Sequence, residues 1–139
     1  MKLAAVRRRV AIGGVGPAWR PALDQVWAFL RTQPGLRTDG HNVFLYHHVA
    51  RVVVTVDFGV QVARPFDGDG DVRCVATPAG RVASTVHRGP YDRLGDAHAA
   101  VAAWCEGSAR AIGAASWEIY GDWSDDPAKL ETQVVYLLA

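Results

Sequence analysis

The chain of 139 residues is long enough to form one domain with a substantial apolar core. Its fifteen Lys and Arg nearly balance its fourteen Asp and Glu, and the formal net charge is +1. This balance argues against direct nucleic-acid binding, because contact with phosphates needs a concentrated basic surface. No segment approaches the roughly 20 apolar residues of a membrane span, and arginines interrupt the N-terminus where a signal peptide would be apolar. We therefore expect a cytoplasmic protein without a membrane partner, in which Cys74 and Cys105 are reduced thiols or, as the alternative, form a single disulfide.

The first half of the chain predicts a strand, a helix and two further strands. Residues 2–12 are typical of a strand, in which we expect the run of arginines at 7–9 to face solvent. After a break at Gly16-Pro17, apolar residues recur at helical spacing and predict a helix over about residues 18–33; they are Leu23, Val26, Trp27 and Leu30. Strands are predicted at 42–49 and 52–62. The second of them alternates apolar with mainly polar residues, so one of its faces is expected to meet the core.

The second half repeats this order after a turn-rich connector at 64–71. Strands are predicted at 72–77 and 81–88, and a helix over about residues 91–112 follows the break at Gly89-Pro90. Apolar residues share one face of this helix; they are Leu94, Ala97, Val101, Trp104 and Cys105. Gly113 is expected to end the helix, and strands at 115–121 and 131–138 complete the chain.

The two Gly-Pro breaks lie 73 residues apart, and the same offset aligns Phe44-Leu45-Tyr46 with Trp117-Glu118-Ile119. We therefore predict an α+β fold, with residues 1–139 forming one domain of two pseudo-symmetric strand–helix–strand–strand units at about 1–64 and 72–139. An antiparallel sheet and a pseudo-twofold arrangement of these units would leave a ligand cleft between them.

Glu118 is the most informative polar residue, because it lies within a predicted strand among Trp117, Ile119 and Tyr120. Burial of an ionised carboxylate is costly unless partners compensate it. Strand alternation puts Glu118 and Tyr120 on one face, with Trp117 and Ile119 on the other. The alternative is that Glu118 faces water on the exposed side of a sheet.

The stretch from Pro78 to the C-terminus carries a set of motifs in a consistent order. They are Pro78-Ala79-Gly80, His87-Arg88-Gly89-Pro90-Tyr91 with Leu94, Trp117-Glu118-Ile119-Tyr120, Asp122, Pro127, Thr132 and the apolar run from Val134 to Leu138. This stretch resembles the ligand-binding half of the GyrI-like superfamily, which includes the effector-binding domains of AraC- and MerR-type regulators. The first half shares the element order but few motif residues. The resemblance implies a pocket between the two halves, with aromatic walls and Glu118 as the acidic residue at its floor.

Further ligand-binding candidates follow from these faces and offsets. Tyr120 shares the face of Glu118, and Tyr91 opens the second helix at the expected rim. The 73-residue offset puts Leu45 and His47 on the pocket face, while Phe44 and Tyr46 face away from it. Trp19 is a candidate wall residue. Trp104, on the apolar helix face, is either a core residue or a further ligand contact.

The sequence predicts no metal site and no cofactor. His41, His47 and His48 lack partners at ligand spacing, and adjacent histidines on a strand point to opposite faces. Gly14-Val15-Gly16 lacks the third glycine of a dinucleotide-binding loop.

Three functions are compatible with this pattern. The first is a stand-alone protein that binds an amphipathic or cationic hydrophobic compound, for sequestration or sensing. The second is a hydrolase of strained, cyclopropane-type natural products, in which Glu118 acts as general base and Tyr120 or a histidine assists; the resemblance implies this activity. The third is a protein-interaction module of the gyrase-inhibitor type. The sequence leaves the oligomeric state open.

Overall fold

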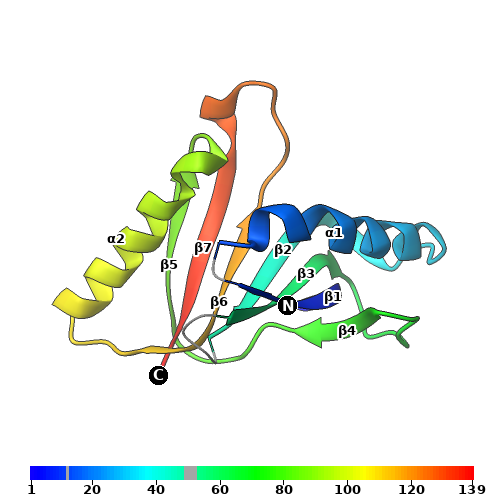
Figure 1. The fold of residues 1–139 in the computed structure, drawn as a ribbon, viewed down its shortest axis with the longest axis horizontal. Coiled ribbons are helices and arrows are strands. Elements are labelled where there is room, and N and C mark those ends of the chain that lie inside the picture. The colour runs from blue at the N-terminus through cyan, green and yellow to red at the C-terminus, as the bar shows by residue number, and fades with distance from the viewer. Residues whose placement is uncertain (12, 49–52) are drawn as a thin grey trace.

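The computed structural model describes residues 1–11, 13–48 and 53–139. Within these residues, strands form one antiparallel sheet in the order β4-β1-β3-β2-β6-β7-β5 (Figure 1). The strands are β1 (Lys2–Ala11), β2 (Arg37–His47), β3 (Val53–Val62), β4 (Val72–Ala76), β5 (Val82–Arg88), β6 (Ile112–Tyr120) and β7 (Glu131–Leu138). The helices are α1 (Val15–Arg31) and α2 (Leu94–Gly107), with single 3₁₀ turns η1 (Tyr91–Arg93) and η2 (Pro127–Lys129).

The sheet contains the predicted α+β repeat. Strands β1, β3 and β2 lie in the same order as β5, β7 and β6, and each set runs from an outer position to the centre. The two sets meet at the centre, where β2 pairs antiparallel with β6 and Phe44 lies opposite Glu118. We expected the second unit to begin near residue 72. However, β4 pairs with β1 and extends the sheet of the first unit, so the second repeat runs from β5 to β7.

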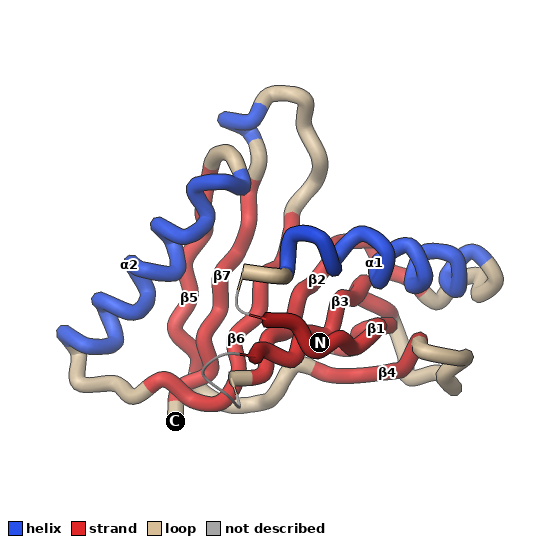
Figure 2. Tube along the Cα trace, in the orientation of Figure 1, coloured by secondary structure: helices blue, strands red, loops and turns tan. Residues whose placement is uncertain are grey.

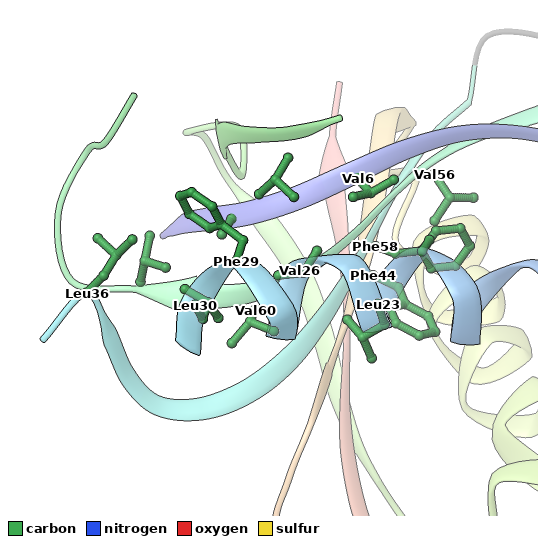
Figure 3. Close-up of a cluster of buried hydrophobic side chains, with 14 of the residues drawn as sticks. Val6, Leu23, Val26, Phe29, Leu30, Leu36, Phe44, Val56, Phe58 and Val60 are labelled. Atoms are coloured by element: carbon green, nitrogen blue, oxygen red, sulfur yellow. The ribbon is translucent and has the colours of Figure 1, made fainter. Parts of the chain in front are cut away.

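Both helices lie on one face of the sheet (Figures 1 and 2). Helix α1 packs on β1 and β3, and α2 packs on β5 and β7. The buried face of α1 carries Leu23, Val26 and Leu30, which contact side chains such as Phe58 of β3 (Figure 3). Trp27, predicted on this face, is partly buried, and its indole Nε1 donates a 3.2 Å hydrogen bond to Asn42 Oδ1.

The opposite face of the sheet is also buried, although neither α1 nor α2 covers it. Its apolar cluster comprises Leu3, Ala5, Val43, Leu45, Ala115, Trp117 and Val135. The sheet bends strongly between its two halves (Figure 2), and this curvature brings the back-facing side chains together. Gly59 permits the close approach of β1, since a Cβ there would lie 2.9 Å from the carbonyl oxygen of Ala4.

Part of β3 that its sequence pattern assigns to the polar face is also buried. Asp57 is 1% exposed, and its carboxylate accepts hydrogen bonds from Arg7 Nε at 2.8 Å and Arg7 Nη2 at 3.0 Å. Arg7 itself is half-exposed, as the predicted solvent-facing arginine run requires.

The helix limits differ from the predicted ones. Helix α1 begins at Val15, before the predicted residue 18, and α2 ends at Gly107 instead of extending to 112. The chain closes the end of α2 with a 2.8 Å bond from Arg110 N to Cys105 O, and Ala109 adopts a left-handed φ of 55°. Ile12, Val49 and Val52, at predicted strand positions, lie outside the described residues. Among the described residues, no helix combines the length and apolar character needed to cross a membrane.

Candidate functional site

A pocket of about 420 Å³ opens between the N-terminal ends of α1 and of the η1–α2 segment. Its lining comes from both halves of the sheet: Val15, Trp19, His41, Asn42, Phe44, Tyr91, Tyr120, Gly121, Asp122 and Trp123. This volume falls in the range of small-molecule sites, roughly 300–1,000 Å³, and the lining has the mixture of aromatic walls and few polar groups usual for such sites.

Aromatic rings in the lining contact one another and form a continuous wall. The Phe44 and Tyr120 rings lie 4.9 Å apart between centroids, and Tyr91 meets Tyr120 edge-on at 5.5 Å. Trp19 lies 6.3 Å from Phe44. These separations and tilts are those that aromatic pairs prefer, so the wall is preformed.

Glu118 lies beneath this wall, two residues before the end of β6, and is 4% exposed. The hydroxyls of Tyr46 and Tyr120 each donate a 2.7 Å hydrogen bond to its Oε1. Its Oε2 lies 2.6 Å from Nε2 of His98 on α2. Tyr120 therefore links the pocket to a buried carboxylate that has a partner at both oxygens.

The tyrosines of this network remain protonated. Burial raises the pKa of Tyr46 and of Tyr120 well above the usual value, and the charge of Glu118 raises both further. Burial and the same carboxylate raise the pKa of Tyr136, whose hydroxyl lies 2.6 Å from His98 Nδ1. Phenols that keep their protons can serve as hydrogen-bond donors to an anionic partner at any physiological pH.

The face assignment in β6 is confirmed. Glu118 and Tyr120 point toward the pocket side, while Trp117 and Ile119 pack in the back-face cluster with Leu45. The alternative of a water-facing Glu118 is wrong, because the side chain is buried and its carboxylate is bonded to Tyr46, Tyr120 and His98.

The predicted faces in β2 are reversed. Phe44 lies opposite Glu118 and Tyr46 bonds to it, whereas Leu45 lies opposite Trp117 on the back of the sheet. His47 also points to the back, with its Nε2 2.8 Å from Asp57 Oδ2. A single 73-residue offset failed here because Phe44 and Glu118, which lie opposite each other on the same face, are 74 residues apart, and an offset wrong by one residue reverses the face of every side chain.

Trp19 and Tyr91 lie in the pocket lining, but Trp104 does not. Trp104 is 54% exposed and borders a different hollow between α2 and β5, so it is neither a core residue nor part of the pocket wall.

Sequence reasoning missed His98 and Trp123. His98 follows Leu94 by one helical turn and precedes Val101 by three residues, so a polar side chain on the apolar stripe of a helix was the available signal. Trp123 lies in the β6–β7 loop, where no periodic pattern marks its position.

A polar pair lies at the pocket mouth. His41 Nε2 is 3.2 Å from Asp122 Oδ1, and the Asp122 side chain is 95% exposed. The pocket thus presents a solvated carboxylate at its entrance and a desolvated one beneath its wall.

The family model of the GyrI-like small molecule binding domain matches residues 1–137 of the chain. The crystal structure of the EcmrR C-terminal domain superposes with a TM-score of 0.77 and 21% identity, over 99% of this chain and 92% of that one. EcmrR in a cryo-EM structure of its DNA complex gives a TM-score of 0.78, also at 21% identity, and here the match spans 99% of this chain and 53% of the other.

At this level of identity, the two structures establish the fold. No curated protein matches the chain in sequence. The family model covers nearly the whole chain, and the architecture agrees with it. The chain therefore belongs to the GyrI-like small molecule binding domain family.

Proposed function

We propose that this protein binds an amphipathic or cationic aromatic compound in the pocket between its halves, for sequestration or sensing. The observation that carries the proposal is the aromatic wall of Phe44, Tyr91 and Tyr120 above the buried carboxylate of Glu118. Aromatic faces attract organic cations by about 0.5–2 kcal/mol per well-placed ring, and the nearby negative charge adds to this attraction.

The polar groups of the pocket support a ligand with one charged or polar end. Glu118 and Asp122 supply negative charge below and at the mouth of the pocket, whereas Trp19 and Trp123 offer flat apolar surface. A ligand with an aromatic body and a cationic end would match both parts of this lining.

The test uses two probes of the same shape, the 4-biphenylyltrimethylammonium ion and its uncharged isostere 4-tert-butylbiphenyl. Intrinsic tryptophan fluorescence at pH 8 reports binding, since Trp19 and Trp123 line the pocket. Glu118→Gln should weaken binding of the cation by about 1–3 kcal/mol, the range for losing a charged partner, and leave the uncharged probe within about twofold.

Asp122→Asn is the matched control, because it removes a carboxylate that water screens. We expect it to weaken cation binding by less than about 1 kcal/mol. If neither probe binds the parent protein, or if Glu118→Gln binds the cation like the parent, the proposed function is wrong.

A hydrolase is the second candidate, favoured by the two protonated phenols on one carboxylate oxygen. In such a reaction, water would bond to a carbon of a strained ring while a ring C–C bond breaks. The released electron pair would take a proton from the Tyr120 hydroxyl, and the proton lost by water would return to Tyr120 through Glu118. The net change is the addition of one water.

Mass spectrometry of a cyclopropane-containing electrophile incubated with the protein tests this activity. An enzyme would yield a product heavier by one water, and Tyr120→Phe, which removes the proton donor, should abolish its formation. Unchanged compound after prolonged incubation would exclude this hydrolysis. The third candidate, an interaction module, stays a prediction.

We also propose that the protein acts in the cytoplasm with reduced thiols and that this domain does not itself bind nucleic acid. Cys74 and Cys105 are both free, and the net charge of +1 offers little for phosphate binding.

A further inference from the structure

His98 connects α2 to the buried carboxylate and has a partner at each ring nitrogen. Nε2 lies 2.6 Å from Glu118 Oε2, and Nδ1 lies 2.6 Å from the Tyr136 hydroxyl. The His98 side chain is partly buried. The imidazole thus bridges an acceptor on β6 and a group on β7 that can either donate or accept.

The donors on Glu118 determine where the first proton of His98 lies. Oε1 already accepts hydrogen bonds from Tyr46 and Tyr120. An ionised carboxylate only accepts, so the short contact at Oε2 requires a proton on His98 Nε2.

The second nitrogen of His98 can carry a proton or lack one in the same geometry. When Nδ1 is protonated, it donates to the Tyr136 hydroxyl oxygen. When Nδ1 is unprotonated, the hydroxyl of Tyr136 donates to it. The 2.6 Å distance between Nδ1 and the hydroxyl oxygen fits a hydrogen bond in either direction, so no side chain must move when His98 changes charge.

Several other titratable groups lie on the elements packed around this pair. They are Tyr46 on β2, His48 directly after β2, Tyr120 on β6, Tyr136 on β7, His87 on β5, Tyr91 on η1 and Cys105 on α2. The tyrosines keep their protons, and burial together with nearby His47 and His98 lowers the pKa of His48, which favours its uncharged form. His87 bonds to the carbonyl oxygen of Pro90, 2.9 Å away. The charges of Glu118 and His98 therefore dominate the field beneath the pocket.

We propose that His98 decides which charge of ligand the pocket accepts. With His98 protonated, the His98–Glu118 pair is neutral, and the pocket favours uncharged aromatic molecules. With His98 neutral, the charge of Glu118 is uncompensated, and the pocket favours cations. This inference rests on the proposed function and adds that cation binding and loss of the His98 proton are thermodynamically linked.

Thermodynamic linkage determines the sign and the upper limit of the change in cation affinity with pH. If a cation binds better when His98 is neutral, binding must release protons, and raising the pH must tighten binding. Release of one full proton corresponds to a tenfold gain in affinity per pH unit, and the gain ends once His98 is neutral in the free protein. An uncharged ligand should show less than about twofold change over the same range.

The experiment titrates the protein with 4-biphenylyltrimethylammonium and with 4-tert-butylbiphenyl between pH 5.5 and 8.5. Neither probe titrates, so any pH dependence belongs to the protein. We expect at least a tenfold increase in cation affinity with pH and a nearly constant affinity for the uncharged probe. Calorimetry of the cation in two buffers of different ionisation enthalpy should show proton release near the midpoint.

His98→Asn should bind the cation with an affinity independent of pH, and His87→Asn, the matched control, should retain the dependence of the parent. Persistent pH dependence in a folded His98→Asn variant would assign the titration to Glu118 or to another group and overturn the inference. So would pH-independent binding of the cation by the parent, which would leave the proposed function intact. Binding of neither probe would instead refute the proposed function.

Circular dichroism establishes whether His98→Asn folds. If it does not, Tyr136→Phe takes its place. It removes the hydroxyl bonded to Nδ1, and the charged imidazole loses more than the neutral one, because hydrogen bonds from a charged donor are the stronger ones. The pH dependence of cation binding should then move to lower pH. An unchanged midpoint would contradict the role of His98.

Discussion

Tyr46 and Tyr120 donate to the same carboxylate oxygen of Glu118, although they belong to different halves of the molecule. Antiparallel pairing explains this convergence. Phe44 lies opposite Glu118, so Tyr46 and Tyr120, each two residues along its own strand, occupy the two flanking positions on the same face. The hydrogen bond from Tyr46 to Glu118 therefore crosses the junction between β2 and β6, whereas the bond from Tyr120 stays within β6.

Replacing either tyrosine by Phe should separate the contribution of these hydrogen bonds to stability from their contribution to ligand binding. Each change removes one donor to a buried charge, so we expect the free energy of unfolding in urea to fall by about 1.5–3 kcal/mol. Tyr120→Phe should also alter ligand binding, because Tyr120 lines the pocket. Tyr46→Phe should leave the affinity for an uncharged ligand unchanged, because Tyr46 is not in the lining. Equal effects of both changes on an uncharged ligand would contradict this division.

Trp123 is 72% exposed and borders the pocket, an exposure that a bound aromatic ligand would reduce. Trp123→Ala should change stability by less than about 0.5 kcal/mol, as for other surface positions. It should weaken binding of a biphenyl probe by about 0.5–1.5 kcal/mol through loss of ring contact. Trp104→Ala is the control, since Trp104 is also exposed but borders a different hollow. A loss of affinity in Trp104→Ala equal to that in Trp123→Ala would refute the assignment.

Asp57 should contribute a pH-dependent part of the stability. Burial alone would raise its pKa, but hydrogen bonds from Arg7 and His47 outweigh it and hold the pKa below its usual value. A carboxyl with a lowered folded pKa stabilises the fold above the unfolded value of about 3.9, and this contribution disappears as the pH falls through the lowered pKa.

Asp57→Asn should therefore cost about 2 kcal/mol at pH 7, the scale of hydrogen bonds to a charged group. Urea unfolding at neutral pH and below pH 3 measures the difference from the parent, which should shrink in acid. A difference that is constant with pH would show that Asp57 contributes through shape alone.

Gly59 should tolerate no side chain. A Cβ there would lie 2.9 Å from Ala4 O and 3.0 Å from Ala5 Cβ, both on the neighbouring strand. Gly59→Ala should destabilise the protein by about 1–3 kcal/mol through overpacking. Gly95→Ala in α2 is the control, because a Cβ at Gly95 meets no atom within 4 Å and alanine favours a helix by about 0.5–1 kcal/mol. Chemical denaturation of the two variants should give opposite signs.

The sequence contained enough to predict the repeated element order and the faces of β6. Alternation over residues 117–120 is local, so Glu118 and Tyr120 could be assigned to one face without knowledge of any partner strand. The alternation in β3 likewise identified the face that meets α1, through residues such as Phe58 and Val60.

Features that depend on contacts between strands could not be predicted. Local alternation could not determine which side of β2 faces the pocket, and the offset assigned Leu45 and His47 to the wrong face. The burial of Asp57 depends on Arg7 and His47 of the neighbouring strands, which no local pattern encodes. The end of α2 at Gly107 depends on backbone bonds formed after the helix, whereas Gly113 was the more conspicuous signal in the sequence.

The junction between β2 and β6 has a consequence for how the molecule responds to a ligand. Trp19 belongs to the first half and Tyr91 to the second, and the ladder between β2 and β6 joins the packing units around α1 and α2. A compound held against both rings would act as a removable cross-link between these units. Its binding energy would then suppress independent opening of either half, so slowed amide hydrogen exchange should extend to β1 and β5, which contribute no residue to the pocket lining.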